Sequence, residues 1–191
     1  MFVDTLQFLL ATVFVHNIVL TQFLGLCPFI GISHHAGAAS GMAIATTLIL
    51  TLTAGLAYPL YWHVLVPLEL VELYTLALIF LIASLVQALE ILIRISSELL
   101  AQRLGVYLPL ITSNCAVLGV GLLVVQQELT SWWQSIVFGL GAGLGFSLAL
   151  IVMAQLRQRL QFAKVAPCLQ NIPIGLITAG IASLGLLGLK F

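Results

Sequence analysis

The sequence predicts an all-α membrane protein with six transmembrane helices, and both its composition and its pattern of apolar runs indicate this. Of its 191 residues, 62% are hydrophobic and only 6% are charged, whereas a soluble domain carries about 25% charged residues. The mean hydropathy is +1.22. Disordered, collagen-like and nucleic-acid-binding proteins are excluded, since none can be built from so few charges and so little Lys and Arg.

Six apolar runs of spanning length follow one another along the chain, and each predicts one helix. They lie near residues 5–26, 41–62, 73–93, 105–125, 133–154 and 172–190. A spanning helix takes about 20 residues, so these runs and their short connections leave no room for a soluble catalytic domain. The first residues lack the basic stretch of a secretory signal, so we expect the first run to be retained as a span.

Positively charged residues predict which connections face the cytoplasm. The third connection carries Arg94 and Arg103, and the fifth carries Arg157, Arg159 and Lys164, whereas the second and fourth carry neither Lys nor Arg. Because positive loops stay on the cytoplasmic side, we expect the first, third and fifth connections inside. Both termini are then expected in the periplasm.

An internal repeat divides the chain. The segment Leu24–Gly31 aligns with Thr112–Gly119, and both contain the pattern Cys-x-x-x-Gly, at Cys27 and at Cys115. Each copy opens a group of three spans, so the sequence predicts one repeat over residues 1–95 and a second over 96–191. Three is odd, so the second group crosses the membrane in the opposite sense and the two form an inverted-topology repeat.

The two cysteines are expected near the middle of the bilayer. The 12 residues from the preceding arginine to Cys115 span about 18 Å as a helix, which reaches the midplane. A straight first helix would instead carry Cys27 about 34 Å, to the far side. We therefore expect broken helices, at Gly25 and Pro28 in the first copy and at Pro109 in the second, because Pro removes a backbone donor and Gly allows unusual dihedrals.

Two interpretations of the cysteine pair remain open at this point. Cys-x-x-x-Gly is a small-residue pattern that lets membrane helices pack closely. Alternatively, the two thiolates are metal ligands that face one another across a pseudo-two-fold axis, which suits zinc or an iron–sulfur cluster. A cluster held by four cysteines then needs a partner that supplies two more. Close backbone approach around such a site would be permitted by four glycines, Gly25, Gly31, Gly119 and Gly121.

Three stretches carry a resemblance to a known family. Phe23–Phe29, Leu108–Gly119 and Ile177–Gly180 closely resemble the RnfA/NqrE family, and the similarity extends over essentially the whole chain. These proteins are membrane subunits of the Rnf complex and of the sodium-pumping NADH:quinone reductase. Cys-Pro-Phe after Gly-Leu is more similar to the RnfA branch than to the NqrE branch.

The resemblance implies a function in electron transfer. It implies a paralogous, RnfE-like membrane partner of opposite orientation and a [2Fe–2S] cluster shared at the interface, with Cys27 and Cys115 as this chain's iron ligands. The other Rnf subunits (B, C, D and G) would carry flavins and further iron–sulfur clusters in a bacterial inner membrane. The complex would couple ferredoxin/NAD oxidoreduction to ion translocation, with no complete active site in this chain alone. Cys168 lies outside the motifs and is expected to be a bystander.

Other polar residues and other functions fit the same sequence. Thr112, Ser113 and Asn114 are candidate hydrogen-bond donors to a cluster, while His16 and Asn17 are expected to make interhelical hydrogen bonds. A secondary transporter also uses inverted repeats with broken helices, and a structural scaffold or a homodimer would fit the same spans.

Four alternate glycines, Gly139, Gly141, Gly143 and Gly145, form two interleaved Gly-x-x-x-Gly patterns and predict a close-packing face.

Overall fold

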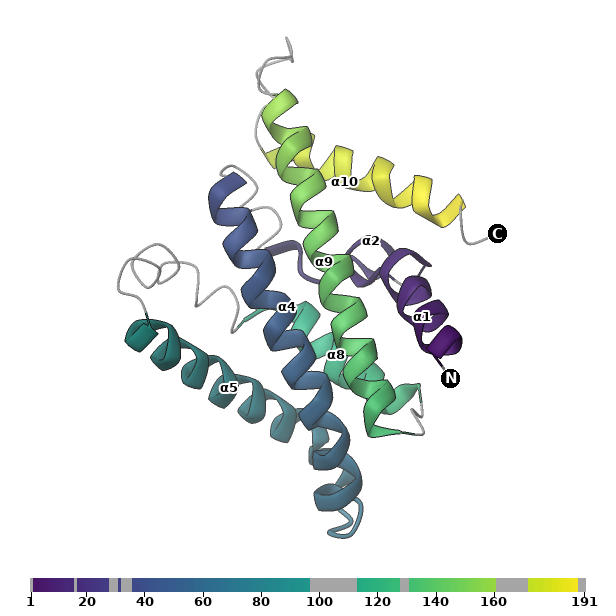
Figure 1. Cartoon of the computed structure of the whole chain (residues 1–191), viewed down its shortest axis with the longest axis vertical. Coiled ribbons are helices and arrows are strands. Elements are labelled where there is room, and N and C mark those ends of the chain that lie inside the picture. The colour runs from purple at the N-terminus through teal and green to yellow at the C-terminus, as the bar shows by residue number, and fades with distance from the viewer. Residues whose placement is uncertain are drawn as a thin grey trace.

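The computed structural model describes residues 2–15, 17–27, 31, 36–96, 113–127, 131–160 and 172–188, and all regular structure in these ranges is helical (Figure 1). The helices follow the six predicted apolar runs. The expected all-α membrane fold is therefore confirmed.

Three helical stretches are long and apolar enough to cross a bilayer, namely Ser40–Leu65, Val71–Leu92 and Trp132–Leu156. They belong to α4 (Ala36–Pro59) with a π-helical continuation (Leu60–Leu65), to α5 (Tyr74–Ser96) with a preceding 3-10 turn (Val71–Leu73), and to α9 (Trp132–Leu160). The change from α to π geometry follows Pro59, which lacks the backbone donor of a regular turn.

The first span is broken, as the sequence predicts. It consists of α1 (Phe2–Leu10), a π-helical turn (Ala11–Val15) and the short α2 (Ile18–Gln22). Helix α2 ends at Phe23, whose φ of 54° is left-handed, and Gly25 follows with a φ of 86°. Positive φ cannot continue a right-handed helix, so the chain changes course just before Cys27.

The other two helices are shorter than a full span. Helix α8 (Cys115–Gln126) begins at the second cysteine of the repeat, and its 12 residues rise about 18 Å, roughly half of a bilayer's thickness. Helix α10 (Ile172–Leu187) follows α9. A helix start at Cys115 is consistent with the break expected in the second copy, whereas Pro28, Pro109 and residues 97–112 lie outside the described part of the chain.

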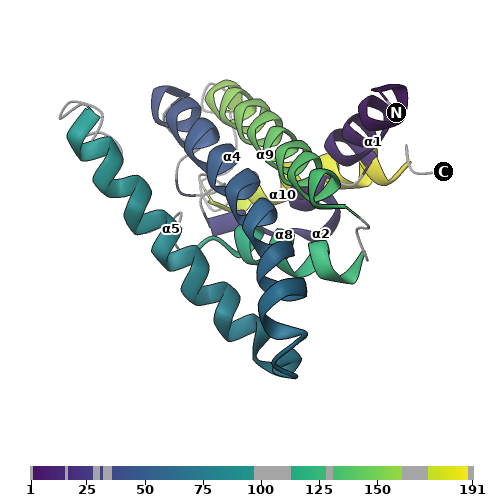
Figure 2. The same cartoon turned by 60° about the horizontal axis from the view of Figure 1, so that its bottom comes forward.

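Helices α4 and α9 pack side by side through the centre of the molecule (Figures 1 and 2). A methyl group at Gly139 of α9 would lie 2.5 Å from the Ala54 Cβ, and one at Gly143 would lie 2.8 Å from the Thr47 Cα. No side chain larger than hydrogen fits there without moving the backbone. One of the two glycine patterns therefore faces α4.

The second glycine pattern of α9 faces the broken first span instead. A methyl group at Gly141 would lie 3.0 Å from the Thr12 Cβ, and one at Gly145 would lie 3.1 Å from the Val13 carbonyl oxygen. The predicted close packing is thus confirmed, and α9 has two close-packing faces, one for each glycine pattern. Because the two patterns are offset by two residues, they point to different sides of α9 and hold two different spans against it.

Hydrogen bonds fix the direction of the central pair. The indole Nε1 of Trp132, at the start of α9, donates to the Gly55 carbonyl near the end of α4, at 2.7 Å. Farther along, the Thr47 hydroxyl donates to the Gly143 carbonyl at 3.0 Å. The two helices are therefore antiparallel, and the connection that follows α4 lies at the same end as the one that precedes α9.

Helices α5 and α10 each pack against a helix from the other half of the sequence. Helix α5 packs on α8, where the Tyr74 hydroxyl donates to the Gly121 carbonyl at 2.7 Å and Leu78 covers the same glycine. Helix α10 packs on α2. The third helix of each half thus contacts the broken span that opens the other half.

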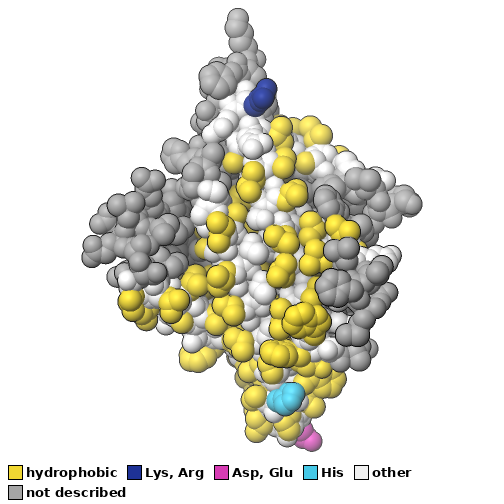
Figure 3. Space-filling model, in the orientation of Figure 1, with side chains coloured by type: hydrophobic (Ala, Val, Ile, Leu, Met, Phe, Trp, Pro, Cys, Tyr) yellow, Lys and Arg dark blue, Asp and Glu magenta, His cyan; other side chains and the backbone are white. Residues whose placement is uncertain are grey.

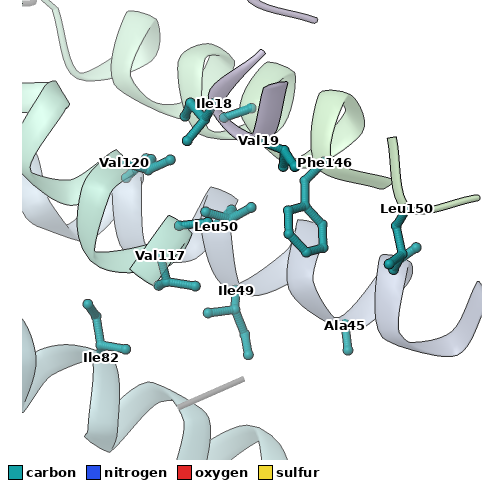
Figure 4. Close-up of a cluster of buried hydrophobic side chains, with 14 of the residues drawn as sticks. Ile18, Val19, Ala45, Ile49, Leu50, Ile82, Val117, Val120, Phe146 and Leu150 are labelled. Carbon is teal, nitrogen blue, oxygen red and sulfur yellow. The ribbon is translucent and has the colours of Figure 1, made fainter. Parts of the chain in front are cut away.

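A buried apolar core joins helices from both halves of the sequence (Figure 4). It includes Val19, Leu50, Ile82, Val117 and Phe146, which come from α2, α4, α5, α8 and α9. The outside is also apolar over much of the visible face, with charged and His side chains near its two ends (Figure 3). A multi-pass membrane protein shows this distribution, because lipid rather than water surrounds its middle.

Candidate functional site

The two cysteine motifs of the internal repeat meet in the structure. The Gly25 backbone N–H, two residues before Cys27, donates to the Cys115 Sγ at 2.9 Å. The contact joins positions 90 residues apart in the sequence. The two segments that the repeat aligns with each other, Leu24–Gly31 and Thr112–Gly119, are therefore in direct contact.

Gly25 can hold this position only because it lacks a side chain. Its φ of 86° is rarely adopted by other residues, and a methyl group there would lie 2.8 Å from the Phe146 Cε2 and 3.1 Å from the Ala116 Cβ. Phe146 stands halfway along α9, about 21 Å from either end of that helix. The junction of the two motifs therefore lies near the middle of α9.

The neighbouring glycines differ in how closely they are packed. Leu24 packs on Gly119, where a methyl group would lie 3.2 Å from its Cδ1, and Leu78 packs on Gly121. Nothing in the described part of the chain lies within 4 Å of the place a Gly31 Cβ would take. The expected close approach is thus confirmed at Gly25, Gly119 and Gly121, whereas for Gly31 it stays a prediction because the residues on both sides of it lie outside the described part of the chain.

The two thiols differ in exposure. Cys27 is exposed at the surface of this chain, whereas Cys115 is partly buried at the first position of α8, and both are free thiols. Two residues span at most about 7 Å, so the Cys27 backbone lies close to Gly25 and hence to the Cys115 side. The described residues contain no group of three or more His, Cys, Asp or Glu that could hold a metal ion. The two cysteines could therefore serve as ligands only as part of a larger set.

Asn114 adjoins this junction and is 2% exposed. Its Oδ1 accepts a hydrogen bond from the Ala116 N–H at 3.0 Å and so caps the N-terminus of α8. Its Nδ2 is buried and has no hydrogen-bond partner among the described residues. An unsatisfied buried donor costs about 1–3 kcal/mol, so this amide is an unusual feature of the junction.

Comparison with known proteins identifies the family. The model of a family described as "Rnf-Nqr subunit, membrane protein" matches residues 5–191. The chain belongs to the Rnf-Nqr family. The resemblance seen in the sequence is thereby confirmed over nearly its full length.

Several relatives in the Rnf-Nqr family are strongly similar. The A-type subunit of the ion-translocating oxidoreductase complex of Alcanivorax borkumensis is 50% identical over 180 residues, 94% of this chain and 93% of the relative. The protein of the same name from Tolumonas auensis is 49% identical over 97% of this chain and 95% of the relative. The A-type subunit of the Na(+)-translocating ferredoxin:NAD(+) oxidoreductase complex of Acetobacterium woodii is 45% identical over 94% of this chain and 93% of the relative.

The other candidate residues of this Rnf-Nqr chain either have places in the structure or lie outside the described residues. Asn17 donates to the Gly145 carbonyl at 3.0 Å, which is the interhelical hydrogen bond expected of it. Ser113 is exposed beside the junction. His16, Thr112 and Cys168 lie outside the described residues.

Two features of the junction were not predicted from the sequence. The cap on α8 had a readable signal, because an Asn directly before an apolar helical run is a preferred N-cap. The contact of Phe146 with Gly25 had none, because it joins residues far apart in the chain and depends on how α9 packs against the broken first span.

Proposed function

We propose that this chain is the A-type membrane subunit of an Rnf-type ion-translocating oxidoreductase complex in a bacterial inner membrane. Within it, Cys27 and Cys115 supply two of the four cysteine ligands of a [2Fe–2S] cluster. The other two come from a paralogous, RnfE-like subunit of opposite orientation. The B, C, D and G subunits complete the complex and carry the flavins and the remaining iron–sulfur clusters.

The names of the relatives support the coarse part of this proposal. The A-type subunits of two ion-translocating oxidoreductase complexes are about half identical to this chain over nearly its whole length. One relative is named for a complex that acts on ferredoxin and NAD(+) and moves Na(+). At such identity and coverage, a shared place in a homologous complex is the simplest account of the chain.

The single observation that carries the cluster proposal is the hydrogen bond from the Gly25 N–H to the Cys115 Sγ. It brings two soft donors of the kind that iron prefers into one neighbourhood, with Cys27 open at the surface for a partner to approach. A sulfur that carries negative charge as an iron ligand is stabilised by such a donor. The residues present therefore fit a shared cluster, with two ligands on this chain.

The position of the junction suits electron transfer through the bilayer. When bound, the cluster would accept and release single electrons between cofactors on the two sides, which are separated by about 30 Å of hydrocarbon. Around it, this chain's residues exclude water and orient the sulfurs. Phe146 and Ala116 close the site behind Gly25, and the N-terminal end of α8 favours negative charge at Cys115.

The contacts between the two halves support the inverted repeat. Under a two-fold relation of residues 1–95 to residues 96–191, the packing of α5 on α8 corresponds to that of α10 on α2, and α4 pairs with α9. The broken spans then form the cofactor site and the other four helices hold them. Three proposed crossings in each half, together with the positions of Arg and Lys, support a periplasmic location for both termini.

Co-purification with the partner tests the function. The chain expressed together with its RnfE-like paralogue should bind two iron atoms per pair, absorb visible light and give a [2Fe–2S] EPR signal after reduction. Expressed alone, it should bind no stoichiometric cluster, because two thiolates cannot complete the site. A colourless, iron-free pair would overturn the cluster and favour a transporter or a scaffold. A cluster on the chain alone would overturn the sharing with a paralogue.

A further inference from the structure

The side-chain amide of Asn114 is a hydrogen-bond donor that the fold leaves unused beside Cys115. Its oxygen is committed to the cap of α8, and its nitrogen is buried without a partner among the described residues. Asn114 immediately precedes Cys115, and its Oδ1 lies 3.2 Å from the place a Gly25 Cβ would take. The amide is therefore part of the junction of the two motifs.

A second asparagine in the same chain shows that capping does not require an unpaired amide. Asn17 caps α2 in the same way, with its Oδ1 accepting from the Val19 N–H at 3.2 Å. Its Nδ2, however, donates to the carbonyls of Val13 and Gly145, at 3.3 and 3.0 Å. Capping thus explains the oxygen of Asn114 and leaves the nitrogen unexplained.

We infer that Asn114 is a positioning residue for the proposed cluster, with its Nδ2 donating a hydrogen bond to a sulfur of that site. Together with the Gly25 N–H, it forms a pair of donors at the Cys115 side. The inference rests on the proposed function, because the acceptor that it assigns to the buried amide is a sulfur of the proposed cluster.

The consequence of this donor is a higher reduction potential. Reduction adds one negative charge to the site, and an N–H dipole directed at a sulfur stabilises the reduced form more than the oxidised form. In a low-dielectric interior this stabilisation is only weakly screened. Loss of the amide donor should therefore make the site harder to reduce, without removing a ligand.

The test compares Asn114→Ser with Asn17→Ser in the complete complex. Serine is a good N-cap, so Asn114→Ser keeps the cap of α8 while it deletes the amide. We expect wild-type iron content in Asn114→Ser. The equilibrium constant for reduction should fall about tenfold, which lowers the midpoint potential by about 59 mV for a one-electron couple. Asn17→Ser deletes an amide that is bonded to peptide carbonyls, so its complex should titrate as wild type.

Pulsed EPR provides a second readout that does not need a variant to assemble. The reduced wild-type complex grown with ¹⁵N-asparagine should show a ¹⁵N coupling to the cluster, together with an exchangeable proton. Absence of this coupling, or an unshifted potential in an iron-replete Asn114→Ser complex, would overturn the role of Asn114 and leave the proposed function intact. If the wild-type complex held no cluster at all, the proposed function itself would fail.

Discussion

At the scale of single residues, Gly25 is a position where both the backbone conformation and the neighbouring atoms require glycine. Its left-handed φ, its N–H donor to Cys115 and the ring of Phe146 each limit what can stand there. The break it makes is also what separates Cys27 from a straight continuation of the first span. One residue thus connects the local backbone to the arrangement of the proposed ligands.

Replacing Gly25 by alanine should disrupt the junction. The left-handed conformation costs a residue with a Cβ about 1–2 kcal/mol. The methyl group must also displace the Phe146 ring, and overpacking costs roughly 1–3 kcal/mol. We expect lower yield of the complex and a lower thermal unfolding midpoint in detergent. Gly31→Ala is the matched control, because no described atom lies within 4 Å of its added methyl. Equal stability of the two variants would contradict the geometry at Gly25.

At the scale of elements, α9 is the helix against which the rest of the molecule is arranged. Its two glycine patterns hold α4 on one side and the first span on the other. The side-chain hydrogen bonds from Trp132 and Thr47 tie α9 to α4 at well-separated levels. Close packing of this kind drives helix association in lipid, where the hydrophobic effect between spans is absent.

Gly139→Ala tests that packing. The added methyl meets the Ala54 Cβ at 2.5 Å and the Leu50 carbonyl oxygen at 2.8 Å, so α4 must shift. The expected destabilisation is about 1–3 kcal/mol, measured as a lower thermal midpoint of the purified complex. In α10, Gly185→Ala meets nothing within 4 Å among the described residues. This control should be neutral or stabilising by about 0.5–1 kcal/mol through its helix propensity. A stable Gly139→Ala protein would show that α4 and α9 do not need this contact.

Some features of the helices could be predicted from the sequence and others could not. The apolar runs predicted the spans because hydropathy is a property of each segment by itself. The conflict between the depths of Cys27 and Cys115 predicted the break at Gly25, because helix rise is fixed. The contact of Gly25 with Phe146 was not predictable, because packing between distant segments decides it.

At the scale of the whole molecule, antiparallel α4 and α9 set the order of the crossings. The connections after α4 and before α9 lie at one end, as the Trp132 to Gly55 hydrogen bond requires. Neither of these connections contains Lys or Arg, whereas Arg159 lies near the other end of α9. The arrangement of the helices and the distribution of positive charge therefore both indicate that successive connections lie on opposite sides of the membrane.

Reporter fusions test the orientation of this path. Alkaline phosphatase fused to either end of this sequence should be active, and green fluorescent protein at the same places should stay dark, because the positive connections hold the opposite side in the cytoplasm. A fusion after Arg159 provides the internal control and should behave in the reverse way. Fluorescence at either end would show that the orientation is inverted or that a span is missing.

The central claim is that the two motif cysteines are cluster ligands, and EPR of the assembled complex with single serine substitutions tests it most directly. Serine is nearly isosteric with cysteine but a far poorer iron ligand, so packing should persist while the site becomes incomplete. We predict that Cys27→Ser and Cys115→Ser complexes assemble without the [2Fe–2S] signal and without electron transfer, whereas Cys168→Ser retains both. A normal signal and normal iron content in an assembled Cys27→Ser complex would contradict the account and return both cysteines to ordinary helix packing.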